Sequence, residues 1–134
     1  MKTLLVLEDE PSLIKLLRHT LRDYRVIEAT TAEEALLLFI DHDYVVDLLV
    51  ADLTLPTKSG IQVALHLRSK IPDLPVILTS GYPKSSWSDR DSADLRRLGE
   101  SSVKVLQKPF AGYQLLDAIC DLTGWPPLWK ARTA

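Results

Sequence analysis

The feature that most constrains the fold of this chain is a regular alternation of short apolar runs with segments of helical periodicity. Each apolar run is four to eight residues long and is followed by a polar or charged residue, as expected of a strand buried on both faces of a sheet. The predicted strands are Thr3–Leu7, Val26–Ala29, Tyr44–Ala51, Pro75–Leu78 and Val103–Gln107.

The segments between these runs carry local indications of helices. Pro11 suits the first position of a helix, and apolar residues recur after it at helical spacing as far as Tyr24. Thr31 and Glu34 have the spacing of a capping box, in which the side chain of each residue accepts a hydrogen bond from the backbone N–H of the other. The predicted helices are one that begins at Pro11 and those that cover 31–40, 61–68, 89–98 and 113–122.

Strands that alternate with helices at this spacing imply right-handed crossovers, which build a parallel sheet with helices on both faces. Five such units predict an α/β fold of the flavodoxin-like, doubly wound type with strand order 2-1-3-4-5. The 134 residues fit one domain, for which we expect bounds of 1–123, followed by a Trp- and Pro-containing tail at 124–134. Ligands bind such sheets beyond the carboxyl ends of the strands, so the chemistry is expected there.

Composition excludes several classes of protein. There are 16 Lys and Arg against 18 Asp and Glu, and this net charge of −2 argues against binding to nucleic acid or a membrane surface. The single cysteine, Cys120, excludes an internal disulfide and fits a reducing compartment. No apolar run approaches the ~20 residues that span a bilayer. Acidic residues also stand where a signal peptide would be cleaved, so we expect a cytoplasmic domain.

Charged and hydroxyl side chains follow the predicted strands. Glu8 and Asp9 follow the first strand, Asp52 the third, Thr79 the fourth and Lys108 the fifth. The first and third strands are neighbours in the predicted order, so three carboxylates converge there and call for a neutralising cation. Mg²⁺ prefers such oxygen ligands. With an ammonium and a hydroxyl opposite, the set suits a phosphoryl group formed on a carboxylate, with Asp52 as the nucleophile.

Four motifs at these strand ends resemble those of the receiver domains of response regulators in two-component signalling. The motifs are LLVLEDEP, LLVADLTLPTKSG, VILTSG and VLQKPF, and the resemblance covers roughly residues 3–122. The resemblance implies that Asp52 is the phosphoacceptor. It also implies that Asp9, Asp52 and the backbone carbonyl of Thr54 bind Mg²⁺ directly, while Glu8 acts through a metal-bound water.

On the phosphoryl side, the resemblance implies that Lys108 pairs with the phosphoryl group and that Thr79 turns inward to bind it. It further implies that the Lys108–Pro109 peptide bond is cis. Receivers take the phosphoryl group from a phosphohistidine on a histidine kinase or a histidine phosphotransfer protein. They use it to shift an equilibrium between two conformations.

Two residues set this chain apart from the usual receiver pattern. Val105 stands three positions before Lys108, where receivers commonly carry an aromatic residue whose inward movement follows that of the Thr. Without that ring, we expect the switch to act through backbone movement around Gly81 or through the segment 89–98. Gly81 also leaves the phosphoryl site open on one side, so we expect no steric shielding of the acyl phosphate.

Other conspicuous residues have plainer interpretations. His19, His42 and His66 lie on polar helix faces or in a loop and are expected to be solvated. Cys120, on the last helix, is expected to be a buried small residue rather than a reactive thiol. The role of Trp87, in the polar loop near the site, is left open. In the tail, Trp125 and Trp129 either cover the domain or dock a partner, and the sequence favours neither.

We therefore expect a receiver, stand-alone or of the hybrid-kinase type, that is not an enzyme beyond its own phosphorylation and dephosphorylation. The residues after the last helix are too few for a DNA-binding module. Output is then expected through a downstream protein partner, a phosphorelay or a homodimer. Two alternatives stay open. One is a receiver-like interaction module that is never phosphorylated, which Val105 faintly favours. The other is an enzyme on the same sheet, which the acidic first loop and Thr54 disfavour.

Overall fold

Five parallel strands form one sheet in the order β2-β1-β3-β4-β5, so the doubly wound α/β prediction is confirmed. The computed structural model describes residues 1–56 and 58–128. The strands are β1 (Thr3–Leu7), β2 (Arg25–Ala29), β3 (Leu48–Asp52), β4 (Val76–Ser80) and β5 (Val103–Gln107). The helices are α1 (Pro11–Thr20), α2 (Ala32–Asp41), α3 (Gly60–Arg68), α4 (Asp89–Leu98) and α5 (Gly112–Thr123), with short 3-10 helices η1 (Lys84–Ser86) and η2 (Glu100–Ser102).

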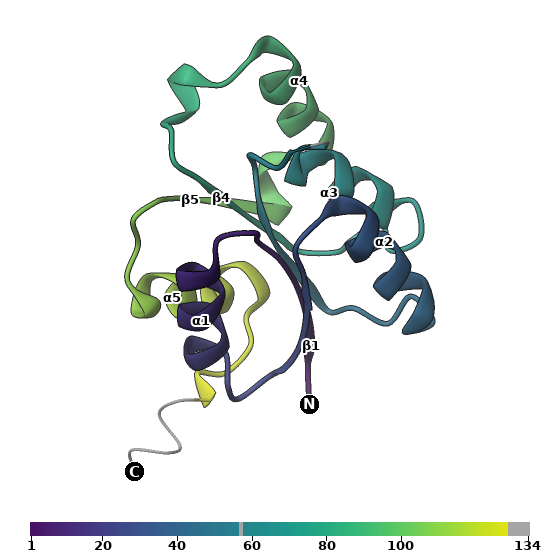
Figure 1. Cartoon of the computed structure of the whole chain (residues 1–134), viewed down its shortest axis with the longest axis vertical. Helices are drawn as coiled ribbons and strands as arrows, with labels where there is room; N and C mark the ends of the chain where they lie inside the picture. The colour runs from purple at the N-terminus through teal and green to yellow at the C-terminus, as the bar shows by residue number, and fades with distance from the viewer. Residues whose placement is uncertain (57, 129–134) are drawn as a thin grey trace.

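Helices cover both faces of the sheet, with α1 and α5 on one face and α2 and α3 on the other (Figure 1). Because alternate residues of a strand point to opposite faces, Leu5 and Leu7 of β1 join the core that contains α2, α3 and α4. Leu4 and Val6 join the core that contains α1 and α5. Every residue of β1, β3 and β4 is buried, which explains why these strands are continuous apolar runs in the sequence.

The predicted third strand starts too early, because β3 begins at Leu48 and not at Tyr44. Asp43 and Tyr44 have positive φ values of 54° and 62°, so the chain turns sharply before the strand. The first helix also ends earlier than its apolar spacing indicates. It stops at Thr20, although Tyr24 in the following turn is still buried.

The starts of α2 and α3 show two forms of helix capping. Thr31 Oγ1 accepts a hydrogen bond from Glu34 N at 3.0 Å, as predicted. The Glu34 carboxylate, however, accepts from Thr30 N at 2.8 Å and not from Thr31 N, so the predicted capping box is only half formed. A complete capping box joins Ser59 and Gln62 at the start of α3, which the sequence analysis did not identify.

Arg68, the last residue of α3, ties the end of α4 to the rest of the domain. Its guanidinium donates to the carbonyl oxygen of Leu98, the last residue of α4, and to that of Leu74 at 3.1 Å. It also donates to the carbonyl and hydroxyl oxygens of Ser102, at 3.2 Å and 2.7 Å. The carboxyl-terminal end of α4 is therefore firmly anchored through backbone carbonyl groups.

The described part of the tail folds back onto the domain. Gly124, with a φ of 74°, ends α5, and the ring of Trp125 then packs against Tyr24 with the centroids 6.0 Å apart. Lys2 Nζ lies 5.1 Å from the centroid of the Trp125 ring. Trp125 thus covers the domain, whereas Trp129 lies outside the described residues. Among the described residues, no helix has the length and apolar character needed to cross a membrane.

Candidate functional site

The three predicted acidic residues come together at the carboxyl end of the sheet. Glu8 and Asp9 follow β1, Asp52 ends β3, and these two strands are parallel neighbours. One carboxylate oxygen of each residue lies within 4.8 Å of the others. Glu8 and Asp52 are only 2% and 5% exposed, while Asp9 is exposed. Like charges this close, two of them shielded from water, are costly unless a cation neutralises them.

Glu8 is held in place by the backbone of its own loop. Its Oε2 accepts hydrogen bonds from Asp9 N at 3.0 Å and from Glu10 N at 3.1 Å. Burial raises the pKa of the Glu8 carboxyl, although the backbone hydrogen bond from Glu10 and the positive charge of Lys108 oppose this effect. Its Oε1 lies 3.0 Å from Lys108 Nζ but receives no hydrogen bond of good geometry from the described residues. This buried oxygen therefore keeps acceptor capacity for a further donor.

Lys108 lies between the two buried carboxylates. Its Nζ is 3.0 Å from Glu8 Oε1 and 3.1 Å from Asp52 Oδ2. Burial alone would lower the pKa of the Lys108 amine, but the hydrogen bonds and charges of Glu8 and Asp52 outweigh it and raise that pKa. The Lys108–Pro109 bond is cis, as the resemblance implies. The backbone of Lys108 is joined to the end of β4, because its N–H donates to the carbonyl oxygen of Ser80 at 2.7 Å.

Asp52 is flanked by both predicted threonines. Its Oδ1 accepts a hydrogen bond from Thr54 N at 3.2 Å, and Thr54 is exposed. The pairing of β3 with β4 places Asp52 opposite Thr79, which is 2% exposed, and Leu53 N donates to Thr79 O at 2.8 Å. Helix α3 begins directly behind Asp52, since a Cβ at Gly60 would overlap the Asp52 carbonyl oxygen. The backbone that carries the Asp52 carboxylate therefore has little freedom to move.

The donor set of this site fits a hard divalent cation. Three carboxylates supply oxygen ligands, and the acceptor capacity left on Glu8 Oε1 suits a water bound to such an ion. The exposed Asp9 makes the cluster accessible from solvent. All the residues predicted for the metal and phosphoryl sides, Glu8, Asp9, Asp52, Thr54, Thr79 and Lys108, meet at this one edge.

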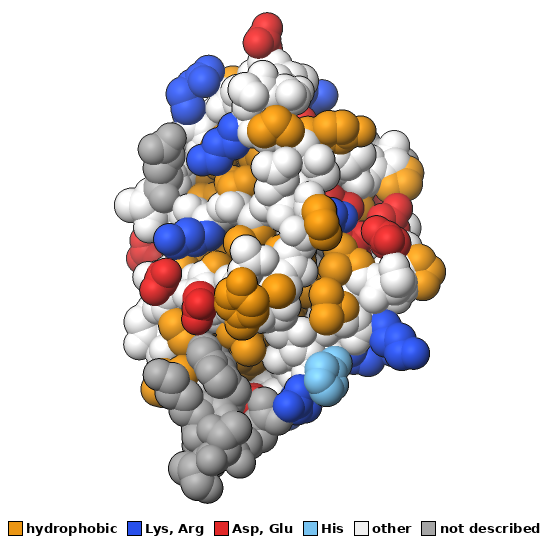
Figure 2. Space-filling view, turned by 90° about the vertical axis from the view of Figure 1, so that its left-hand side faces the viewer, with side chains coloured by type: hydrophobic (Ala, Val, Ile, Leu, Met, Phe, Trp, Pro, Cys, Tyr) orange, Lys and Arg blue, Asp and Glu red, His pale blue; other side chains and the backbone are white. Residues whose placement is uncertain are grey.

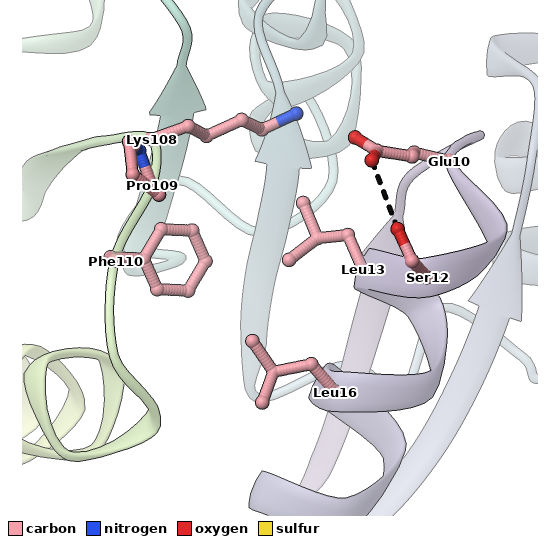
Figure 3. A pocket seen from close by; sticks show the side chains of 7 residues that line it. All are labelled: Glu10, Ser12, Leu13, Leu16, Lys108, Pro109 and Phe110. Atoms are coloured by element: carbon pink, nitrogen blue, oxygen red, sulfur yellow. Dashed lines mark hydrogen bonds between the residues drawn. The ribbon is translucent and has the colours of Figure 1, made fainter.

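A hollow of about 390 Å³ opens next to Lys108, between the start of α1 and the loop from β5 to α5 (Figure 3). Phe110 lines it from the loop after β5, Leu13 and Leu16 line it from α1 on the other side, and near them Ser12 Oγ donates to the Glu10 carboxylate at 2.9 Å. The face that carries this region gathers apolar side chains across its middle (Figure 2). This hollow was not predicted from the sequence, because it forms only where two segments about 95 residues apart in the chain meet.

The remaining residues singled out from the sequence lie outside this arrangement. His19, His42 and His66 are exposed, as expected. His42 Nδ1 lies 2.8 Å from the carbonyl oxygen of Leu38 on its own helix. Cys120 is half-buried, which is less burial than expected.

Comparison with known proteins gives consistent matches. The family model of the response regulator receiver domain matches residues 4–120. The response regulator GtcR of Aneurinibacillus migulanus is 35% identical over 111 residues, which cover 81% of this chain and 42% of that protein. The sensor kinase CckA of Brucella abortus is 29% identical over 124 residues, which cover 90% of this chain and 12% of that protein. The chain thus spans less than half the length of these curated relatives.

Solved structures give the same assignment. The response regulator protein TrrA of Thermotoga maritima, in complex with Mg²⁺-BeF, has a TM-score of 0.72 at 31% identity, covering 91% of this chain and 99% of that one. The chemotaxis protein CheY4 of Vibrio cholerae has a TM-score of 0.76 at 22% identity, covering 91% and 98%, and supports the fold alone. With its fold, its acidic cluster and a family match over most of its length, the chain belongs to the response regulator receiver domain family.

Proposed function

We propose that this chain is a phosphorylation-activated signalling switch in which Asp52 accepts a phosphoryl group with the help of Mg²⁺. The observation that carries the proposal is the position of the Asp52 carboxylate, 3.1 Å from the Lys108 ammonium and within 4.8 Å of the Glu8 and Asp9 carboxylates. A carboxylate in this setting is a nucleophile with a fixed cation on one side and metal ligands on the other.

In the proposed transfer, an Asp52 carboxylate oxygen attacks the phosphorus of a phosphohistidine. The new O–P bond forms as the P–N bond breaks, and the electron pair of the broken bond leaves with the imidazole nitrogen. Lys108 Nζ would then neutralise charge on one phosphoryl oxygen, and the Thr79 hydroxyl would donate to another. Both groups act where negative charge accumulates in the transition state.

The metal ligands proposed here are Asp9, Asp52 and the carbonyl oxygen of Thr54, with Glu8 acting through a water. When bound, Mg²⁺ supplies positive charge that stabilises the phosphoryl oxygens and offsets repulsion among the acids. Glu8 contributes a buried carboxylate that is already oriented by two backbone N–H groups.

The proposed phosphoryl donor is a histidine kinase or a histidine phosphotransfer protein. The hollow beside Lys108 offers it the apolar side chains of Leu13, Leu16 and Phe110, next to the charged site. Burial of apolar surface there would hold the donor while its phosphohistidine approaches Asp52.

Output is proposed to pass through a downstream protein partner or a homodimer in the cytoplasm, without direct contact with nucleic acid or membrane. The chain is proposed not to be an enzyme beyond the formation and loss of its own acyl phosphate. The curated relatives GtcR and CckA are longer than this chain, so their activities as whole proteins are not carried over to it.

The test is phosphoryl incorporation from acetyl phosphate, followed by intact mass, with and without Mg²⁺. The wild type should gain one phosphoryl group only with Mg²⁺, and Asp52→Asn should gain none. Asp121→Asn, which removes an exposed acid on α5, is the matched control and should behave as wild type. Absence of incorporation in the wild type would instead favour a receiver-like module that is not phosphorylated.

A further inference from the structure

Ser80, the last residue of β4, is bonded in two directions. Its carbonyl oxygen accepts from the backbone N–H of Lys108 at 2.7 Å. Its hydroxyl donates to the carbonyl oxygen of Tyr82 at 2.8 Å and accepts from Tyr82 N at 3.0 Å. Ser80 is fully buried and directly follows Thr79, the partner of Asp52 across the sheet. The turn at 80–82 is therefore coupled to the backbone on both sides of the phosphoryl site.

The Tyr82 carbonyl oxygen accepts a second hydrogen bond, from the indole Nε1 of Trp87 at 3.3 Å. A continuous series of contacts therefore runs from Asp52 through the side chain and backbone of Lys108, through Ser80 and Tyr82, to Trp87. No water or ligand is needed to complete it.

Trp87 also stands at the start of α4. It immediately precedes Ser88, whose hydroxyl caps that helix by accepting from Asp91 N at 3.1 Å. The Trp87 side chain is half-buried and packs against the core that includes Leu95 of α4. Val105 packs against the same core, at the position where receivers usually carry a ring. Trp87 is thus an aromatic side chain that contacts both the turn after β4 and the core beneath α4.

The two ends of α4 are held with different strength. Arg68 fixes the carboxyl-terminal end with several hydrogen bonds to backbone and side-chain oxygens. Among the described residues, the contacts at the amino-terminal end include the Trp87 indole hydrogen bond, the packing of its ring and the Arg90 side chain beside Gln62 of α3. A displacement that starts at Ser80 should therefore move the amino-terminal end of α4 about its anchored end.

We propose that Trp87 is the positioning residue that transmits the state of Asp52 to the β4–α4 connection (residues 81–88) and to the amino-terminal end of α4. The proposal rests on the proposed phosphorylation of Asp52. A phosphoryl group adds negative charge and requires Lys108 Nζ to leave the Asp52 carboxylate for a phosphoryl oxygen. The Lys108 backbone and Ser80 shift with it, and the shared Tyr82 carbonyl passes the shift to the Trp87 indole.

The experiment measures hydrogen exchange of peptides from 81–95 and phosphoryl incorporation by mass on the same samples. In the wild type, phosphorylation with Mg²⁺ should change exchange there by about fivefold or more, the size of a modest coupling between sites. Trp87→Phe keeps the ring but loses the donor to Tyr82, so it should take up the phosphoryl group normally and lose this change. Trp125→Phe, on the opposite side of the domain, is the matched control and should keep both responses.

A second measurement follows the wild-type sequence itself, and the Phe variants serve only to assign its resonances. Protein labelled with 5-fluorotryptophan should show a ¹⁹F shift for Trp87 on phosphorylation and none for Trp125, with resonances assigned from the two Phe variants. If the wild type gains the phosphoryl group while exchange at 81–95 and the Trp87 resonance stay unchanged, the coupling proposal is overturned and the phosphoacceptor stands. Retention of the full exchange response in Trp87→Phe would overturn the coupling proposal as well. If no phosphoryl group is gained, both proposals fail.

Discussion

Substitution of Gly60 by alanine tests the close approach of α3 to the residue proposed as phosphoacceptor. A Cβ at Gly60 would overlap the carbonyl oxygen of Asp52 and lie 2.9 Å from Ala51 Cβ. The Asp52 carbonyl group belongs to the backbone of the central strand β3, so it cannot rotate away from an added methyl group. Gly112 provides a matched control, because it too is the first residue of a helix and its Cβ would meet the Thr20 hydroxyl at 2.8 Å. That obstacle is the end of a side chain and can adjust.

Both substitutions share one favourable contribution, because alanine restricts the unfolded chain and stabilises the protein by about 0.4–1 kcal/mol where its conformation fits. Gly60→Ala additionally crowds a packed interior, which costs about 1–3 kcal/mol. Gly60→Ala should therefore be less stable than Gly112→Ala by about 1–3 kcal/mol. For a chain of this size, each kcal/mol corresponds to roughly 4 °C in Tm, so the two variants should differ by about 4–12 °C.

Urea unfolding followed by circular dichroism measures this difference, and intact mass after acetyl phosphate treatment measures its functional effect. Because relief of the overlap must move the Asp52 backbone, Gly60→Ala should also take up phosphoryl groups about tenfold more slowly than Gly112→Ala, since a displacement of 1 Å can cost roughly 100-fold. Equal stability of the two variants, within about 0.5 kcal/mol, would refute the close approach and the reasoning built on it.

Four further outcomes are expected. In the absence of a phosphoryl donor, Mg²⁺ at ten times its Kd should raise the free energy of unfolding of the wild type by about 1.4 kcal/mol. Asp9→Asn should not show this gain when both proteins are followed by thermal unfolding. Burial raises the pKa of Glu8 in the folded protein above its ordinary 4.5, because the folded state favours the protonated carboxyl. The free energy of unfolding that depends on Glu8 is therefore highest below pH 4.5 and falls as the pH rises through the folded-state pKa. Urea unfolding of Glu8→Gln in Mg²⁺-free buffer should not show that fall, and parallel pH curves for the two proteins would contradict the assignment. Tyr24 carries a buried hydroxyl with no hydrogen-bond partner among the described residues, and burial raises its pKa above 10. Tyr24→Phe should be as stable as wild type or up to about 1 kcal/mol more stable, and calorimetry should show that it resists the loss of stability above pH 10. An added Cβ at Gly81 meets nothing within 4 Å, so Gly81→Tyr should fold normally and lengthen the acyl-phosphate lifetime by shielding it; an unchanged dephosphorylation rate would contradict this.

The parts of the fold that the sequence predicted well are those that depend on burial. The runs of β1, β3 and β4 are apolar because both faces of those strands are covered, and their ends mark the edge where the site lies. The convergence of Glu8, Asp9 and Asp52 then follows from strand order alone. The start of β3 was harder to predict from the sequence, because Tyr44 and Val45 are apolar although they lie in a turn and are exposed. An apolar pattern does not distinguish residues that pair in a sheet from residues that lie just before it.

Local hydrogen bonds were the least predictable features. Glu34 has two backbone N–H groups within reach and bonds to that of Thr30, a choice that depends on the exact path of the chain. Ser80 has no distinctive sequence context beyond its place in a strand-ending motif. Its bond to Lys108 becomes visible only once β4 and β5 are paired and the Lys108 N–H faces its carbonyl oxygen. Interactions that require two separate segments to meet are not encoded in the spacing of either segment.

The contact between Lys2 and Trp125 has a practical consequence for handling this protein. It brings the first residues and the start of the tail together at the amino edge of the sheet, where the amino terminus is marked in Figure 1. Asp52 ends β3 at the opposite, carboxyl edge of the sheet. A tether placed at the amino terminus would therefore fix the molecule with its acidic edge and the hollow beside Lys108 directed away from the support. Captured in this orientation on a biosensor chip, the domain would present its acidic edge uniformly to a binding protein in the flowing phase.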